Sequence, residues 1–373
     1  MRWRPFAGRL ALLLISTLIG LTLAECGLRL YFWKRGVGRD DVQELLRRSR
    51  EEPVELVRAR GVFGLVQPSY YPDVVYELRP NLVGTFRGRS LRTNSHGMRG
   101  VEVTREKPPG TFRIAGIGDS YMFGWGVGQG ETYLEILEGQ LNELSAEERR
   151  FEVLNFAVPG YNTAIEAALY ERKVRYFEPD LLLIHFIGND FEIPHLLQAP
   201  RTLAPSQWYL VELVHGLFGR NPEEELDFIP RNLELLEEKL QEQTREQYRY
   251  MLGPKGFRRA LKRIARLTDE DEIPVLLMML GDLSDERQLV LKAARTQGFR
   301  ALNPAPFFGA YLERAGLEPT RQSWKRAFHI PEDGHPTALA HQAYAEALLV
   351  ELREMGIIGE LASQTVAPPP IPD

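Results

Sequence analysis

Five short runs of apolar residues follow one another through the chain after residue 110, and their spacing is that of strands in a single sheet. Two runs, at residues 181–184 and 275–280, are almost unbroken, which is typical of parallel strands covered by helices on both faces. Apolar residues recur at helical spacing between the runs, so crossover helices are expected. The predicted strands are residues 112–117, 151–157, 180–187, 274–280 and 299–303. The pattern predicts an α/β fold with a doubly wound parallel sheet, in which ligands bind at the carboxyl ends of the strands.

The first 33 residues have the composition of a membrane-directed segment. An uncharged, mostly apolar run covers residues 10–24, and apolar residues continue around Glu25 and Arg29 as far as Trp33. The run is preceded by three basic residues, Arg2, Arg4 and Arg9. This arrangement predicts an N-terminal transmembrane helix that anchors the chain through residues 1–33.

A cleaved signal peptide is the alternative, because residues 10–24 are fewer than the roughly 20 that span a bilayer. No Ala-x-Ala-like cleavage site follows the run, and Cys26 is preceded by Glu25, where a lipoprotein signal has a small residue. These features favour an uncleaved, single-pass anchor. Basic residues also follow the run, so charge alone does not fix the orientation. We expect a cytoplasmic N-terminus with the catalytic part of the chain outside the cytoplasm.

The rest of the chain divides by composition. Residues 34–110 are expected to form a charged juxtamembrane spacer and then a lead-in, whose prolines and glycines predict short strands and turns. Residues 111–358 are expected to form the main domain, with an insertion at about residues 191–272 whose charged, leucine-containing sequence predicts helices. Residues 359–373 include three consecutive prolines and are expected to be a disordered tail.

Composition excludes several classes of function. The chain is 44% hydrophobic and 26% charged, which is the balance of a folded globular protein. Its formal net charge of -5 provides no overall basic field for a phosphate backbone, so nucleic acid is not an expected partner. Cys26 is the single cysteine, which excludes an internal disulfide, and the histidines lack zinc-binding spacing. No metal and no cofactor is expected.

A serine follows the first predicted strand, in the sequence Gly-Ile-Gly-Asp-Ser at residues 116–120. At a strand-to-helix turn the hydroxyl projects over the sheet edge, and the helix N-terminus favours the negative charge that develops during acyl transfer. Ser120 is therefore a candidate nucleophile. The alternative is that Ser120 only caps the helix. A dinucleotide-binding loop fits less well, because Tyr121 stands where the third glycine belongs.

Four motifs then occur in a particular order. They are Gly-Asp-Ser at 118–120 with a following Phe-Gly at 123–124, Asn155 with Gly160 five positions later, Gly-Asn-Asp at 188–190, and Asp-x-His-Pro at 333–336. In this order they resemble the SGNH (GDSL-type) hydrolases over residues 111–358, and residues 93–99 resemble the lead-in of membrane-anchored bacterial members. The resemblance implies a flavodoxin-like sheet, the SGNH hydrolase fold, and an enzyme that hydrolyses ester bonds with a serine nucleophile.

The oxyanion that develops when an ester carbonyl is attacked needs hydrogen-bond donors about 2.7 to 3.1 Å away. The backbone N–H groups of Ser120 and Gly160 and the side-chain amide of Asn189 are candidate donors, and the resemblance implies the same three. Their neighbours Asp119 and Asp190 are expected to support the site. The alternative is that Gly160 only turns the chain and Asn189 only caps a loop.

His335 is the candidate general base, because it lies in the last motif, directly before an amphipathic helix. It would take the serine proton and return one to the leaving alcohol, while a carboxylate orients the ring. The commonest family pattern, Asp-x-x-His, is not kept: Glu332 stands three positions before His335 and Asp333 two before. Either carboxylate could serve, and the shorter reach favours Asp333. His185 is expected in or beside a buried strand, and His341 at a polar helix position.

Three functions follow from these residues. The first is a serine-dependent ester hydrolase that acts on acyl or acetyl esters of envelope glycans or lipids. The second is an O-acyltransferase, in which a sugar hydroxyl intercepts acyl-Ser120 in place of water. The third is a catalytically idle envelope binding module, against which intact Ser120, Asn189 and His335 weigh. The expected partners are an ester-bearing small molecule, lipid or glycan and, through the N-terminal helix, the membrane. No protein partner can be named from the sequence.

Overall fold

The apolar runs form one five-stranded parallel sheet. The computed structural model describes residues 4–34, 58–59, 64–145, 149–194, 197, 210, 246–280, 285–331 and 333–359. The strands are β6 (Thr111–Gly118), β7 (Arg150–Asn155), β8 (Leu181–His185), β9 (Val275–Met278) and β10 (Arg300–Leu302). They lie in the order β10-β9-β8-β6-β7, and every pairing is parallel. Counted along the chain this order is 2-1-3-4-5, the flavodoxin-like order of a doubly wound sheet, so the predicted fold class is confirmed.

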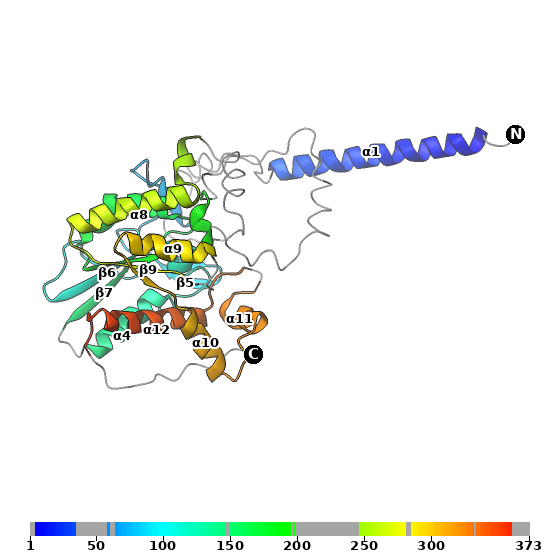
Figure 1. Ribbon diagram of the computed structural model, residues 1–373. Helices are drawn as coiled ribbons and strands as arrows, with labels where there is room; N and C mark the ends of the chain where they lie inside the picture. The colour runs from blue at the N-terminus through cyan, green and yellow to red at the C-terminus, as the bar shows by residue number, and fades with distance from the viewer. Residues whose placement is uncertain are drawn as a thin grey trace.

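Helices cover both faces of the sheet (Figure 1). One face carries α4 (Tyr133–Leu144), α10 (Ala305–Arg314) and α12 (Ala338–Glu354), and α12 packs against both of the others. The helix α11 (Arg321–Phe328) lies beside α10 and α12. The other face carries α5 (Thr163–Arg172), α8 (Gly253–Glu270) and α9 (Asp285–Thr296). Because both faces are covered, β8 and β9 are buried along their whole length, which explains their unbroken apolar sequences.

Short helices and side-chain caps shape the loops at the carboxyl ends of the strands. The short helices α3 (Ser120–Phe123) and η3 (Gly188–Phe191) follow β6 and β8, whereas η2 (Val174–Phe177) precedes β8 and η6 (Glu246–Met251) precedes α8. The side chain of Asn162 accepts a hydrogen bond from the Ile165 N–H and starts α5, and Thr337 accepts one from the Ala340 N–H and starts α12. Each cap fixes the end of the loop before it, and these loops carry the motif residues.

The lead-in forms two small sheets, one antiparallel and one mixed. β2 (Val66–Pro68) pairs with β3 (Tyr76–Leu78), and β4 (Val83–Phe86) pairs with β5 (Arg89–Arg92), with β1 (Arg58–Ala59) alongside β4. An isolated bridge joins Arg99 to Asn155 at the end of the edge strand β7. The lead-in side chains Val66, Tyr76 and Phe86 belong to the same buried core as the five-stranded sheet, so the lead-in packs on the sheet as a continuous part of it.

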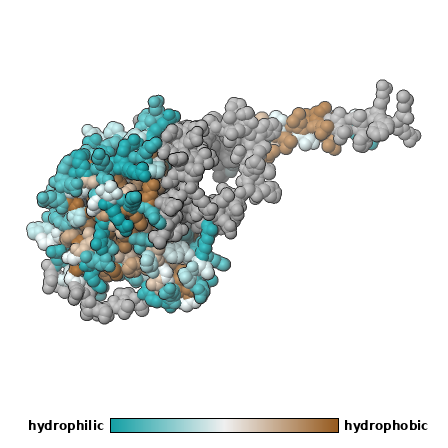
Figure 2. Space-filling view, in the orientation of Figure 1, coloured by the Kyte–Doolittle hydropathy of each residue, from teal (hydrophilic) through white to brown (hydrophobic). Residues whose placement is uncertain are grey.

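The N-terminal helix α1 (Arg4–Lys34) contains an apolar stretch, Leu12–Tyr31, that is long enough to cross a membrane. Its leucine and isoleucine side chains from Leu12 to Leu23 are exposed, and Figure 2 shows this apolar surface outside the body of the protein. The two charged residues within the stretch, Glu25 and Arg29, form an ion pair one helical turn apart. Length and composition fit both a membrane span and a signal sequence near the N-terminus.

Candidate active site

Ser120 stands at the point where β6 ends and α3 begins. The Asp119 side chain caps α3 by accepting a hydrogen bond from the Tyr121 N–H at 2.9 Å. A Cβ atom at Gly118 would lie 2.9 Å from the Cβ of Met122, closer than real side chains approach, so the turn requires glycine there. The strand, the tight turn and the cap together hold the serine at the carboxyl edge of the sheet.

The structure brings His335 to this serine from the other end of the domain. Nε2 of His335 lies 2.9 Å from Oγ of Ser120, at hydrogen-bond distance, and Nδ1 of the same ring contacts Oδ1 of Asp333. The His335 side chain is 21% exposed and that of Asp333 is 8% exposed, so the ring is accessible from solvent and its carboxylate partner is not. Glu332, the alternative carboxylate, lies outside the described residues. Ser120, His335 and Asp333 thus form the contacts that serine activation by a general base requires.

The candidate oxyanion donors lie in the next two loops along the sheet. Gly160 follows β7 in a turn closed by a hydrogen bond from the Tyr161 N–H to the Val158 carbonyl, and its φ of 82° suits glycine. Asn189 lies in η3 after β8, and its Nδ2 donates to Oδ2 of Asp119 at 3.1 Å. An amide nitrogen carries two hydrogens, so one remains for a second acceptor at the site.

Asp119 links the serine to Asn189. Its carboxylate is fully buried, and Oδ2 lies 3.1 Å from both Ser120 Oγ and Asn189 Nδ2. Burial raises the pKa of Asp119 above its ordinary value, although hydrogen bonds from Tyr121 and Asn189 and the charge of His335 act in the opposite direction. The Ser120 hydroxyl therefore lies between two groups that can accept its proton, the Asp119 carboxylate and the His335 ring.

Asp190 holds the Asn189 loop. Its Oδ1 accepts a hydrogen bond from Thr163 Oγ1 at 2.7 Å and its Oδ2 accepts one from the Ile187 N–H at 2.8 Å. Burial and the charge of Asp119 raise the pKa of Asp190. These contacts tie η3 to the start of α5, and this suits the supporting role expected of Asp190.

Several residues at the site were not predicted. The indole of Trp125 stacks on the His335 ring, with centroids 5.1 Å apart and planes at 21°, and its Nε1 donates to Oδ2 of Asp333 at 3.2 Å. The Tyr121 hydroxyl donates to the Gly334 carbonyl at 3.1 Å. Arg87 forms an ion pair with Oδ2 of Asp333. No local pattern marks these positions, because each contact joins segments far apart in sequence.

Two other histidines lie in the core beneath the site. His185, the last residue of β8, is fully buried as expected, with Nδ1 3.1 Å from the Tyr133 hydroxyl. The prediction that His341 occupies a polar helix position was wrong: it is fully buried in α12, and its Nδ1 accepts a hydrogen bond from the Tyr133 N–H at 3.2 Å. Burial lowers the pKa of both rings to about 3, so both are neutral at physiological pH.

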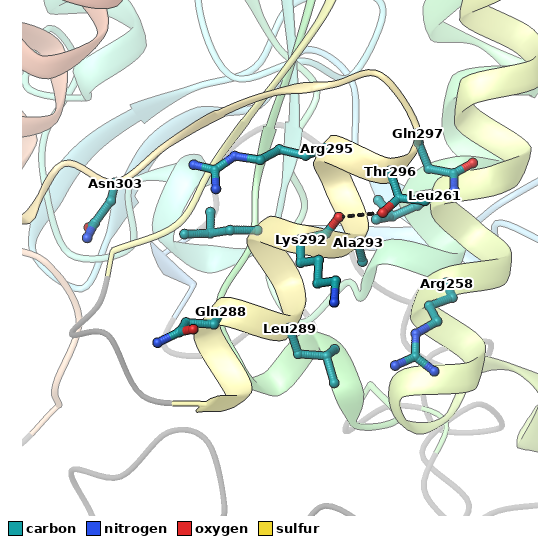
Figure 3. A pocket seen from close by; sticks show the side chains of 11 residues that line it. Arg258, Leu261, Gln288, Leu289, Lys292, Ala293, Arg295, Thr296, Gln297 and Asn303 are labelled. Atoms are coloured by element: carbon teal, nitrogen blue, oxygen red, sulfur yellow. Dashed lines mark hydrogen bonds between the residues drawn. The ribbon is translucent and has the colours of Figure 1, made fainter.

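Within the described residues no group of three or more histidine, cysteine or acidic side chains is arranged to hold a metal ion. A hollow of about 1180 Å³ lies between α8 and α9 (Figure 3). Its lining includes Arg258, Lys292 and Asn303, and none of the residues at the Ser120 site. The hollow is therefore separate from the serine and histidine.

No protein-family model matches this chain, and no curated protein matches it by sequence. Among solved structures, TesA is 15% identical and aligns over 65% of this chain and 99% of its own length, with a TM-score of 0.36. Axe2, an acetylxylan esterase from Geobacillus stearothermophilus, is 17% identical over 66% of this chain and 94% of its own, with a TM-score of 0.39. LAE5, an alpha/beta hydrolase enzyme from the metagenome of Lake Arreo, is 14% identical over 67% and 97%, with a TM-score of 0.40.

Proposed function

We propose that this chain is a serine ester hydrolase of the SGNH type, with Ser120 as nucleophile and His335 as general base. The observation that carries the proposal is the 2.9 Å separation of His335 Nε2 from Ser120 Oγ, with Asp333 on the opposite ring nitrogen. Two segments 215 positions apart in sequence meet there, each from one of the motifs that carry the resemblance. A structural role for the serine alone, as a helix cap, would not require this histidine, and the cap is supplied by Asp119.

In the proposed reaction, Ser120 Oγ attacks the ester carbonyl carbon and its proton passes to His335 Nε2. Asp333 stabilises the imidazolium, and the N–H groups of Ser120, Gly160 and Asn189 bind the oxyanion. The tetrahedral intermediate collapses, the carbon–oxygen bond to the alcohol breaks, and the alcohol leaves with the proton from His335. Water then attacks acyl-Ser120 by the same route, releasing the acid and restoring the serine.

We place this chemistry at a membrane surface. Residues 1–33 serve as an uncleaved anchor, residues 34–110 as spacer and lead-in, and residues 111–358 as the catalytic domain outside the cytoplasm. The substrates are acyl or acetyl esters of envelope glycans or lipids, which such an anchored enzyme would meet. The exposed apolar stretch Leu12–Tyr31 supports the anchor.

Hydrolysis of a short-chain aryl ester by the full-length protein in detergent micelles tests the mechanism. We expect Ser120→Ala and His335→Ala each to lower kcat/KM by about 1,000-fold or more, because each removes a partner of one proton-transfer unit. Ser145→Ala, at the far end of α4, is the matched control and should retain full activity. Undiminished hydrolysis by both site variants would refute the serine mechanism.

The same assay separates the two alternative functions. Ester products formed with added alcohols would identify acyl transfer, and substrate binding without any turnover by the wild type would identify a catalytically idle module.

A further inference from the structure

The tip of the hairpin β4–β5 reaches the His335 loop. Its two-residue turn consists of Arg87 and Gly88, whose φ values of 50° and 80° are those of a type I′ turn. Because this turn matches the twist of the two strands, it fixes the position from which the Arg87 side chain extends. The guanidinium forms an ion pair with Oδ2 of Asp333 and lies over the Trp125 ring, 5.5 Å from its centroid.

The two carboxylate oxygens of Asp333 have separate partners. Oδ1 contacts the His335 ring, whereas Oδ2 accepts a hydrogen bond from Trp125 and pairs with Arg87. The side chain of Asp333 is 8% exposed, and a carboxylate so far removed from water needs compensating partners. Burial alone would raise the pKa of Asp333, but the contacts with His335, Trp125 and Arg87 bring it below its ordinary value.

We propose that Arg87 is a positioning residue: by holding Oδ2 of Asp333, it keeps Oδ1 directed at His335. The role rests on the serine mechanism proposed above. Without Arg87, Oδ2 would keep only the Trp125 N–H, and the less restrained carboxylate could rotate so that Oδ1 turns away from the ring. The planar guanidinium suits this task, because its donors are fixed in one plane and match the geometry of a carboxylate. Trp125 acts on the same oxygen and also stacks on the ring, so the two contacts fix both members of the pair.

The charge of Arg87 opposes its geometric effect. A cation beside Asp333 weakens the stabilisation of the imidazolium that forms when His335 accepts the serine proton. The Arg87 side chain is 39% exposed, so water and salt screen this repulsion, whereas the orientation of the carboxylate is not screened. A variant without the Arg87 charge should therefore show two changes. Its turnover falls, because the carboxylate is less well oriented. The pair of His335 and Asp333 also accepts a proton more easily, which moves the acid limb of the kcat/KM profile to higher pH.

The test compares full-length Arg87→Met, Arg87→Lys and Arg89→Met with the wild type on the short-chain aryl ester. We expect Arg87→Met to lower kcat/KM by about 10- to 100-fold, mainly through kcat, because the base is misdirected. Arg87→Lys should recover part of the loss and keep the wild-type acid limb, since it retains the charge without the planar fork. Arg89, exposed on β5 and without a partner among the described residues, is the matched control and should leave activity unchanged.

A double variant separates positioning from general damage to the fold. In an Asp333→Asn background Arg87→Met should cause no further loss, because no carboxylate remains to be positioned. The proposal fails if Arg87→Met is as active as Arg89→Met. It also fails if the activity losses of Asp333→Asn and Arg87→Met multiply in the double variant. A wild-type level of turnover in Ser120→Ala would instead overturn the serine mechanism, and this role of Arg87 with it. An inactive Ser120→Ala beside a fully active Arg87→Met overturns the Arg87 proposal alone.

Discussion

Three carboxyl groups that interact electrostatically with one another are buried in the core. Asp119, Glu166 and Asp190 are each at most 1% exposed, and burial raises the pKa of all three. The charge of Asp119 raises the pKa of the other two further. Asp119 and Asp190 accept hydrogen bonds, but neither oxygen of Glu166 has a partner within the described part of the chain. Glu166 therefore retains its proton at pH values where an exposed glutamate has lost it, and folding at neutral pH is coupled to proton uptake.

The pH dependence of stability tests this consequence. The folded protein keeps a proton on Glu166 while the unfolded chain loses it above about pH 4.5, so the free energy of unfolding should fall as pH rises from there. One such proton contributes a slope of up to about 1.4 kcal/mol per pH unit. We expect Glu166→Gln to make the slope less steep, with Asp119 and Asp190 still contributing to it, and the exposed Glu143→Gln to leave it unchanged, measured by urea unfolding of the full-length protein between pH 5 and pH 8. Equal slopes in wild type and Glu166→Gln would contradict the assignment.

At the scale of elements, the turn from β6 to α3 sets the position of the serine. Gly118 has no room for a side chain because of Met122, whereas Gly139, in the middle of α4, has nothing within 4 Å of the place where its Cβ would be. The two glycines thus make a matched pair. One is required by close packing, and the other only weakens the helix that contains it.

Alanine at each position should therefore have opposite effects. We expect Gly118→Ala to destabilise the protein by about 1 to 3 kcal/mol through overpacking and to lower esterase turnover by displacing Ser120. Gly139→Ala should stabilise it by up to about 1 kcal/mol through helix propensity, with turnover unchanged. Urea unfolding and aryl-ester hydrolysis of both variants provide the measurement. If Gly118→Ala were as stable and active as the wild type, the turn could not be as tight as its contacts indicate.

Each predicted strand ends within two residues of an observed strand at both of its ends. The strands β8 and β9 are the easiest to predict, since burial on both faces leaves an apolar run that can be recognised without knowing the neighbouring elements. Burial of a helix position depends on the neighbouring element, and His341 was placed wrongly because Tyr133 packs on α12 from α4. Arg87 and Trp125 carry no local signal, since their contacts with Asp333 arise only when distant segments fold together.

At the scale of the whole molecule, side chains of the lead-in form hydrogen bonds and an ion pair with three loops at the carboxyl ends of the strands. The buried guanidinium of Arg99 donates to the carbonyls of Phe123, Gly124, Val127 and Gly128, in the loop that carries Trp125. The Tyr76 hydroxyl donates to the Pro159 carbonyl, beside Gly160, at 3.2 Å. Together with the ion pair of Arg87 and Asp333, these contacts connect the lead-in to the loop before α12, the loop after α3 and the Gly160 turn. The segment before the main sheet therefore helps to fix the loops of the candidate site.

We expect the N-terminal helix to hold the main domain at a membrane. The 20 residues of Leu12–Tyr31 would extend about 30 Å as an α-helix, close to the hydrocarbon thickness of a bilayer, and the internal pair of Glu25 and Arg29 reduces the cost of burying charge there. After expression in a bacterial host we expect the full-length protein to remain in carbonate-washed membranes with its N-terminal residues present in the intact mass. Protease added outside the cytoplasmic membrane should digest the main domain.

Deletion of residues 1–33 separates anchoring from folding. Among the α1 side chains that the structure describes, only Glu25 is buried, so we expect the shortened protein to be soluble and to hydrolyse the aryl ester at the wild-type rate. A cleaved signal peptide gives a different result: the full-length gene product would lose its N-terminal residues and leave the membrane on carbonate washing. Basic residues flank the helix on both sides, so protease access, rather than charge, decides the orientation. Protection of the main domain in intact cells stripped of their outer layers would place the esterase site in the cytoplasm and exclude envelope esters as its substrates.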